Sequence, residues 1–533
     1  GKRVVAAMRR IMENVTDLVL EFGGSLSGEH GDGLVRSEWN RKMFGPTLYE
    51  AFRQIKRGFD PENVLNPGKV VDAPAMEENW RVPPGPVPPD PPTVLDYSKQ
   101  GGFFHSVELC NGAGVCRKTQ GGAMCPSYRA TRDERDTTRA RANALRVALL
   151  GDESEGVDGR RGERANGGRH PFTRSPLHPL SSRWVHEVMD LCLSCKACKS
   201  ECPSNVDLAK LKAEFLQAYY ATRPRPLGHL VVKNIHRLGP FAARFAGVNN
   251  WLARRGFVRR LMEGVVGIDH RRSLPEWHRD HFRRWFSRRP PAAPGAPKVV
   301  LLDDCFTTFQ EPQIGRAAVT LLERAGLSVE LAGACCGRAM ISKGFLAAAR
   351  ELARTGVARL DRLAAAGVPI LGLEPSCILT LADEWPELVP GPAARRVAAA
   401  AESAEGWLAR HARDNRQSFD LPAASGKILF HGHCHQKALT GVAGAVGALN
   451  LVPGADVTVL DAGCCGMAGA FGYETDHYDV SVRIANLALV PALAADPAAT
   501  VVATGTSCRH QIRDLTGRTP IHPLEVLCPT PPT

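Results

Sequence analysis

The chain has 533 residues, of which 44% are hydrophobic and 23% are charged, and its net charge is +12. These values are ordinary for a soluble globular protein of three or four domains, and no run of 18 or more apolar residues indicates a membrane span. Its 16 cysteines, in a chain without a visible secretory signal, favour metal or redox chemistry in a reducing compartment over a disulfide framework. We therefore expect a cytoplasmic protein of multidomain α+β and α/β class.

The first predicted element is an amphipathic helix, because apolar residues repeat at helical spacing from Val4 to Val19. Gly23-Gly24 ends it, and residues 23–33 form a glycine-rich turn that places Glu29 next to His30. The motif Asn66-Pro67-Gly68-Lys69 follows about forty residues later. An acid beside an imidazole in a glycine loop is also compatible with a plain solvated turn.

Together these motifs make residues 1–72 resemble the C-terminal part of FAD-linked oxidases of the vanillyl-alcohol-oxidase type, in particular the D-lactate and D-2-hydroxyglutarate dehydrogenase branch. The resemblance implies that Glu29 binds a divalent metal that polarises a hydroxy acid, and that His30 accepts the hydroxyl proton as hydride leaves for the flavin. It implies that Asn66 and Gly68 contact FAD. It also implies an FAD-binding domain upstream, so we expect the chain, which opens Gly-Lys-Arg, to be a fragment lacking that domain.

Residues 73–99 form a predicted spacer, since eight prolines between 73 and 92 prevent a helix or a central strand. Residues 100–225 follow as a predicted helical, ferredoxin-like domain with two iron–sulfur clusters. Within it, residues 152–170 are rich in glycine and charge and indicate an inserted loop.

The strongest motif of the chain is Cys-x2-Cys-x2-Cys-x3-Cys-Pro, which begins at Cys192. It is the bacterial ferredoxin run, in which three cysteines hold one [4Fe–4S] cluster and the fourth ligates another; a zinc site is the alternative. A degenerate copy lies upstream, with Ala113 where its middle cysteine would stand. We expect one cluster on Cys125, Cys192, Cys195 and Cys198, and a second, with three thiolates and a possible [3Fe–4S] form, on Cys110, Cys116 and Cys202.

A basic helical segment is predicted over residues 226–296, and the positive charge gathers there: residues 221–290 hold 16 Lys and Arg against 4 Asp and Glu. A solvated linker and a docking surface for an anionic membrane or an acidic redox partner are both open readings, and no nucleic-acid motif is present. Membrane association on the cytoplasmic face is thus compatible with the sequence.

The last part is an internal repeat with copies at residues 297–425 and 426–533. In each copy a strand ends at a cysteine, 29 residues separate that cysteine from Cys-Cys-Gly, and a third strand precedes Ser-Cys. Helical segments between the strands predict tandem βαβ domains with parallel sheets, whose carboxyl ends gather ligand-binding groups. The eight cysteines are Cys305, Cys335, Cys336 and Cys377 in copy 1 and Cys434, Cys464, Cys465 and Cys508 in copy 2.

Four convergent thiolates suit an iron–sulfur cluster or a tetrahedral zinc ion. The motif resembles the cysteine-rich domain of heterodisulfide reductase and of the iron–sulfur subunits of glycolate and lactate oxidases. Many members of that family have a further cysteine where Thr380 and Gln511 stand, which argues against a cluster that needs five sulfurs.

These parts predict an FAD-dependent D-2-hydroxy-acid dehydrogenase that oxidises a substrate of the D-lactate or D-2-hydroxyglutarate type and passes electrons through [4Fe–4S] clusters to a quinone, a cytochrome or a flavoprotein carrier. One alternative is a heterodisulfide-reductase-like thiol–disulfide enzyme. The motifs of residues 1–72 argue against it. The other is a non-enzymatic iron–sulfur electron-transfer module.

Overall fold

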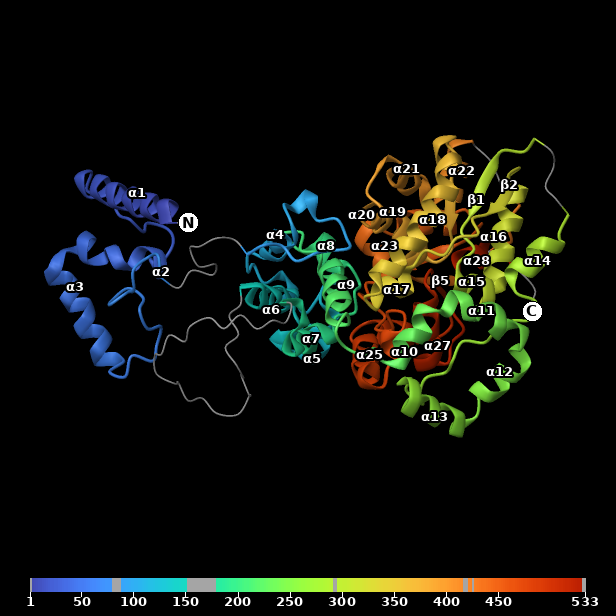
Figure 1. The fold of residues 1–533 in the computed structure, drawn as a ribbon, viewed down its shortest axis with the longest axis horizontal. Helices are drawn as coiled ribbons and strands as arrows, with labels where there is room; N and C mark the ends of the chain where they lie inside the picture. The colour runs from blue at the N-terminus through green and yellow to red at the C-terminus, as the bar shows by residue number, and fades with distance from the viewer. Residues whose placement is uncertain are drawn as a thin grey trace. The chain divides into compact units, whose positions relative to one another are not determined.

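The computed structural model of the protein describes residues 2–78, 88–150, 179–290, 295–415, 420–423 and 426–529 (Figure 1). The chain divides into two compact units, Gly1–Pro89 and Asp90–Thr533. The insertion predicted at 152–170 lies outside the described residues, as do parts of both proline-rich segments. The molecule mixes helical parts with two small parallel sheets.

The first unit is helical and consists of α1 (Lys2–Glu21), α2 (Gly33–Arg36) and α3 (Asn40–Phe59). Helix α1 is the predicted amphipathic helix, and it ends where predicted because Gly23 takes a φ of 63°, which a side chain disfavours. In the described part of this unit the buried apolar residues are Trp39, Val71 and Met76. Such a small core leaves most of the apolar side chains of α1 and α3 in solvent.

The second unit begins with an extended segment that is packed in place. The carboxylate of Glu214 accepts hydrogen bonds from the backbone N–H of Val94 (2.7 Å) and Leu95 (3.0 Å), and Leu95 is buried. The predicted spacer 73–99 is therefore not uniform, because its last residues belong to the second unit. The helices that follow are α4 (Phe103–Glu108), α5 (Pro126–Thr131), α6 (Thr138–Leu150), α7 (Arg183–Asp190), α8 (Ala197–Glu201) and α9 (Leu208–Tyr219).

The two cysteine-rich copies contain the parallel sheets that the repeat predicts. Copy 1 comprises β1 (Lys298–Leu301), α15 (Cys305–Phe309), α16 (Pro312–Arg324), β2 (Ser328–Leu331), α17 (Arg338–Ser342), α18 (Leu346–Ala365), β3 (Ile370–Gly372), α19 (Pro375–Asp383), α20 (Trp385–Leu388), α21 (Pro392–Ala400), β4 (Ala401–Ser403) and α22 (Ala404–Asp414). Copy 2 comprises β5 (Lys427–His431), α23 (Cys434–Leu439), α24 (Ala443–Leu449), β6 (Asp456–Val459), α25 (Tyr478–Asn486), α26 (Leu489–Ala494), β7 (Thr500–Ala503), α27 (Thr506–Thr516) and α28 (Pro523–Leu527).

All strand pairs are parallel, in the orders β2-β1-β3-β4 and β6-β5-β7. The three strands predicted for each copy are present. The sequence reading missed β4, whose three residues Ala-Glu-Ser continue an alanine-rich helix and carry no alternating apolar pattern.

The two copies share a core, although the repeat alone suggests two separate ones, and copy 2 has a second buried cluster of its own around Leu429, Met467 and Ile512. A single cluster of buried side chains joins Leu301 and Leu322 of copy 1 to Phe430 and Val502 of copy 2. A buried ion pair reinforces the junction, since Arg509 Nε lies 2.9 Å from Glu311 Oε1.

Between the cluster domain and copy 1 run the predicted basic helices α10 (Leu227–Lys233), α11 (Ile235–Arg244), α12 (Ala246–Ala253), α13 (Gly256–Val266) and α14 (Phe282–Arg288). Part of this segment is packed, because Gly239 of α11 is buried and a Cβ there would lie 2.6 Å from the Phe309 ring. Other faces are open, with Phe241 and Phe257 each 69% exposed. Among the described residues, no helix is both long and apolar enough to cross a bilayer.

Candidate functional site

The candidate substrate site is the glycine-rich turn that follows α1. Glu29 and His30 lie there with side chains 91% and 78% exposed, and Glu29 Oε2 is 4.0 Å from His30 Nε2. Asn40, at the start of α3, ties this turn to the second predicted motif: its Nδ2 donates to Asp32 Oδ2 (3.0 Å) and to the carbonyl of Val70 (3.0 Å). The structure therefore brings the Glu29-His30 turn and the segment after Asn66–Lys69 to one place.

The segment that carries Asn66 and Gly68 has an unusual backbone. Asn66 (φ 48°), Gly68 (φ 70°) and Val70 (φ 68°) all have a positive φ. A β-branched residue in this region is a steric outlier, and such strain costs about 1–3 kcal/mol. The hydroxyl of Ser37 holds Val70 there by accepting from its N–H at 2.8 Å. The strain indicates that this segment is shaped for a purpose other than stability.

The ferredoxin-type run lies between α7 and α9, where left-handed turns at Ser194 and Lys196 direct the cysteines inward. Burial raises the pKa of the Cys198 thiol to about 12 and that of Cys195 well above its ordinary value. Thiols in such a place ionise when a metal binds them. All sixteen cysteines lie in the described part of the chain as free thiols, so this donor set fits a group held by thiolates.

The degenerate upstream run meets the ferredoxin-type run in space. Cys110, Cys116 and Cys202 line one cavity of about 20 Å³, together with Ala113. Asn111 also lines it, but its Oδ1 accepts from the backbone N–H of Ala113 at 3.0 Å. The three cysteines expected for the second cluster are thus placed together.

Cys125, expected to ligate the other cluster, stands between the two groups. Its thiol is hydrogen-bonded to Cys116 and lies 3.0 Å from Thr138 Oγ1, and Cys198 is close enough to raise its pKa further. The backbone of Cys125 is left-handed (φ 49°), and Pro126 starts α5 directly after it.

The four cysteines of each repeat copy converge at the carboxyl ends of the strands, as the topology predicts. Their thiols form a hydrogen-bonded chain, which runs Cys305, Cys335, Cys336, Cys377 in copy 1 and Cys434, Cys464, Cys465, Cys508 in copy 2. Each set of sulfurs fits an iron–sulfur cluster or zinc. At the fifth position the Thr380 hydroxyl donates to the Ser376 carbonyl and Gln511 Nε2 donates to the Ser481 carbonyl, so neither residue supplies a fifth sulfur.

The charges around the two sets differ, which the sequence reading did not anticipate. In copy 2, His431 hydrogen-bonds Cys465, and Lys437 Nζ lies 3.2 Å from the carbonyl of Gly463, directly before Cys464. Hydrogen bonding to Cys464 and neighbouring positive charge lower the pKa of Cys434 to about 6. In copy 1, Asp304 and Glu374 raise the pKa of Cys377, and Glu374 also raises that of Cys508 in copy 2. A residue-by-residue comparison of the two copies would have revealed this difference.

The ferredoxin-type run adjoins copy 2. His435 of α23 hydrogen-bonds the carbonyl of Ser194 at 3.0 Å. After burial, the neighbouring Cys434 contributes most to raising the pKa of the Cys195 thiol. The thiols therefore form a nearly continuous series from Cys110 through Cys195 to the sulfurs of copy 2.

Comparison with known proteins agrees with this order of parts. Residues 2–70 match the family described as FAD linked oxidases, C-terminal domain. Residues 106–206 match the 4Fe-4S dicluster domain, and residues 299–382 match the Cysteine-rich domain. The three families follow one another in the order that the sequence predicts.

Individual relatives cover the chain almost end to end. It is 30% identical to D-2-hydroxyglutarate dehydrogenase of Escherichia coli over 98% of this chain and 53% of that protein. One subunit of the anaerobic glycerol-3-phosphate dehydrogenase of E. coli is 30% identical over 61% of this chain and 82% of its own length. D-lactate dehydrogenase of Archaeoglobus fulgidus is 48% identical over 59 residues, 11% of this chain and 13% of that protein.

The chain spans about half the length of the D-2-hydroxyglutarate dehydrogenases it matches. The alignment with those proteins nevertheless covers 98% of this chain, which includes all three matched domains. The chain therefore belongs to a family of iron–sulfur proteins that join a FAD-linked oxidase C-terminal domain, a 4Fe-4S dicluster domain and a Cysteine-rich domain in this order, and it is related to D-2-hydroxyglutarate dehydrogenases over 98% of its length.

Proposed function

We propose that the protein takes part in the FAD- and iron–sulfur-dependent oxidation of a D-2-hydroxy acid, of the D-2-hydroxyglutarate or D-lactate type, to the 2-oxo acid. The observation that carries this proposal is the match of 98% of the chain to D-2-hydroxyglutarate dehydrogenases. The Glu29-His30 turn supports it, because an acid and an imidazole side by side suit metal binding and proton abstraction.

In this proposal Glu29 would hold a divalent metal, which would supply Lewis-acid polarisation of the substrate hydroxyl, and His30 would take the hydroxyl proton. Asn66 and Gly68 would contact the flavin. Asn40 positions the two groups relative to each other through its bonds to Asp32 and Val70. The high exposure of Glu29 and His30 leaves both side chains free to meet a substrate.

The cysteine sulfurs of the cluster domain and of the two copies would hold the iron–sulfur groups, which supply one-electron transfer after the two-electron step at the flavin. Eleven of these fifteen cysteines are buried, so the chain would shield the groups from water. Iron suits the cysteine-rich copies better than zinc in this role, since zinc has no redox chemistry.

We also infer that the basic helices α10–α13 dock on an anionic membrane surface. Phe241, Trp251, Phe257 and Leu261 are each more than half exposed, and they stand among the arginines that give the segment its charge. Aromatic and aliphatic side chains among basic residues are the composition of a helix that lies in a membrane interface.

The test of the main proposal uses the full-length protein with the substitutions Glu29→Gln and His30→Ala. Each is expected to lower D-2-hydroxyglutarate or D-lactate oxidation by at least roughly 10²-fold, the value of one positioned acid–base group, with FAD and iron contents unchanged. Glu62→Gln, an exposed glutamate elsewhere in the first unit, is the matched control. Near-normal turnover in either variant would contradict the role proposed for the substituted residue.

A further inference from the structure

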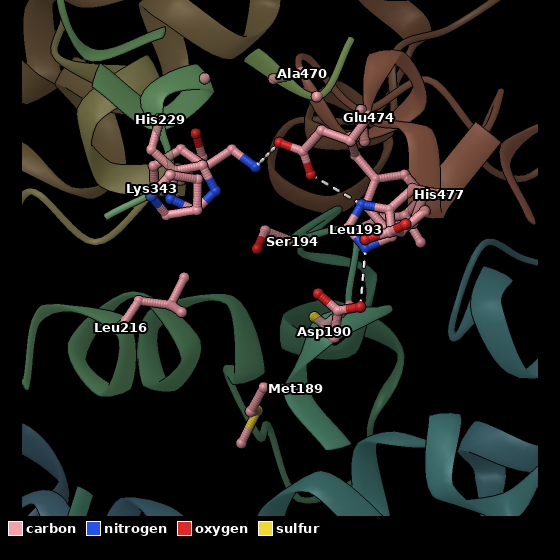
Figure 2. A pocket seen from close by; sticks show the side chains of 18 of the residues that line it. Met189, Asp190, Leu193, Ser194, Leu216, His229, Lys343, Ala470, Glu474 and His477 are labelled. Carbon is pink, nitrogen blue, oxygen red and sulfur yellow. Dashed lines mark hydrogen bonds and ion pairs between the residues drawn. The ribbon is translucent and has the colours of Figure 1, made fainter. Parts of the chain in front are cut away.

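The second unit contains a cavity of about 280 Å³ whose walls come from four parts of the chain (Figure 2). The cluster domain contributes residues from His186 to Tyr220, and α10 and α13 contribute His229 and Val266. Lys343 comes from copy 1, and residues 468–477 come from copy 2. Cys192, an expected cluster ligand, lines the same cavity.

A chain of charged side chains runs along the wall. Glu474 is paired with Lys343 and lies 2.9 Å from His477 Nδ1, and His477 Nε2 lies 3.0 Å from Asp190 Oδ2. Figure 2 shows Lys343 beside His229 at one side of the cavity and His477 above Asp190 at the other, with Glu474 between them. Burial opposes protonation of His477, but its bonds to the two carboxylates outweigh burial and raise its pKa.

Two residues that line the cavity each have a buried polar atom without a partner. In the described part of the chain, these atoms are His229 Nδ1 and Thr475 Oγ1. A buried polar atom left unpaired is unfavourable. A rotation of either side chain toward the cavity would let a bound ligand pair with it.

Part of the remaining lining is apolar and flat. Met189, Leu193 and Leu216 are buried, and the ring of Phe471 stacks on that of His477 with centroids 4.2 Å apart and planes 10° apart. The charged residues of the lining are matched in number, with Lys212, Lys343 and His477 against Asp190, Glu474 and Asp476. The cavity therefore suits a neutral, planar molecule with hydrogen-bonding atoms at its edges.

We propose that this cavity is the electron-acceptor site and binds the head group of a quinone, with Lys343 and His477 supplying hydrogen bonds and protons to its carbonyl oxygens. The proposal rests on the proposed function, in which electrons would reach an iron–sulfur group held by Cys192. Oxidation of a hydroxy acid to an oxo acid releases two electrons and two protons. Reduction of a quinone to a hydroquinone takes up the same number, one proton at each oxygen, so the balance closes.

A quinone fits the cavity better than a protein carrier does. A cytochrome or flavoprotein would meet the outer surface and would need no internal space beside Cys192. The helices that line the cavity, α10 and α13, also carry the exposed apolar residues Leu230, Val231, Leu261 and Val265. A lipophilic acceptor would thus reach the cavity along an apolar surface.

The test uses the full chain with its iron–sulfur groups reconstituted without oxygen, and 2-methyl-1,4-naphthoquinone as the probe. Equilibrium dialysis measures binding of the probe to the oxidised protein. Rapid mixing of the dithionite-reduced protein, freed of excess reductant, measures reoxidation by the probe and by ferricyanide, which needs no cavity. The variants are Ala470→Trp, which fills the cavity from a partly exposed loop, and His477→Gln. The control is His411→Gln on α22, outside the cavity.

We expect Ala470→Trp to weaken probe binding by at least about tenfold, and His477→Gln to slow reoxidation by the probe by roughly 10²-fold. Ferricyanide rates should stay unchanged in both variants, which shows that fold and clusters are intact. Unchanged probe binding in Ala470→Trp, or no binding by the wild type, would overturn the quinone site. If neither oxidant reoxidises the protein, the electron-carrying role in the proposed function is wrong. The quinone site is tested separately, by the dialysis measurement of probe binding.

Discussion

At the scale of single residues, Ala113 stands where a ferredoxin run would have a cysteine, and it lines one cavity with Cys110, Cys116 and Cys202. Three thiolates leave one iron of a cubane without a thiolate ligand, and such an iron is lost readily. We expect air exposure to give a [3Fe–4S] signal in electron paramagnetic resonance, and Ala113→Cys to abolish that signal. A cubane that survives air unchanged in the wild type would mean that another group completes the site.

Glu405, at the start of α22, gives a second prediction at this scale. Its carboxyl is fully buried, and burial raises its pKa from 4.5 to about 7, although contact with Ser403 acts in the opposite direction. Between these pH values the folded chain keeps a proton that the unfolded chain has released. The free energy of unfolding therefore falls as the pH rises through this window, by about 3 kcal/mol in all.

Glu405→Gln has no charge to bury, so its stability should not fall in this way. Calorimetric melting of the variant and the wild type is expected to agree below pH 4.5 and to favour the variant above pH 7. Glu351→Gln, on the exposed face of α18, should show no such divergence. A constant difference between variant and wild type across the pH range would rule out the buried carboxyl as its cause.

At the scale of elements, the helices α10–α13 combine exposed apolar side chains with a high density of arginine. We expect the protein to sediment with vesicles that contain phosphatidylglycerol, more weakly as salt screens the charges, and not with phosphatidylcholine vesicles. The double variant Phe241→Ser, Phe257→Ser should bind these vesicles at least about tenfold more weakly, because each phenylalanine ring moves from water into the membrane on binding.

Phe59→Ser is the matched control for this experiment, since Phe59 is 87% exposed but lies in the first unit. It should leave vesicle binding unchanged. Equal loss in the control, or no sedimentation with either lipid, would show that the basic helices meet something other than a membrane.

At the scale of the whole molecule, the two units differ in how much core they possess. The first unit buries three apolar residues among those described, while the second has an extended shared core. A unit with so little core has little free energy of folding by itself. We expect residues 90–533 to fold and bind iron when expressed alone, and residues 1–89 to melt without cooperativity in circular dichroism. A sharp melt of the 1–89 fragment would contradict this expectation.

Local sequence patterns were enough to predict several elements of this protein. The helical spacing from Val4 to Val19 gives α1, the repeated spacing of the cysteines gives two parallel sheets, and the ferredoxin run gives the densest group of thiols. Each of these features depends on neighbours in the chain, whose geometry is set by backbone sterics and by hydrophobic periodicity. Glu29 and His30 were likewise visible as a motif, and their roles remain proposals.

The tertiary structure decided what joins these parts. The bond from His435 to Ser194 spans 241 residues, the Arg509–Glu311 pair spans 198, and the cavity beside Cys192 needs walls from four segments. Asn40 ties two motifs together from a position that carries no motif of its own. Nothing local marks such partners, because packing of a shared core selects them from many chemically equivalent side chains only once the chain has folded.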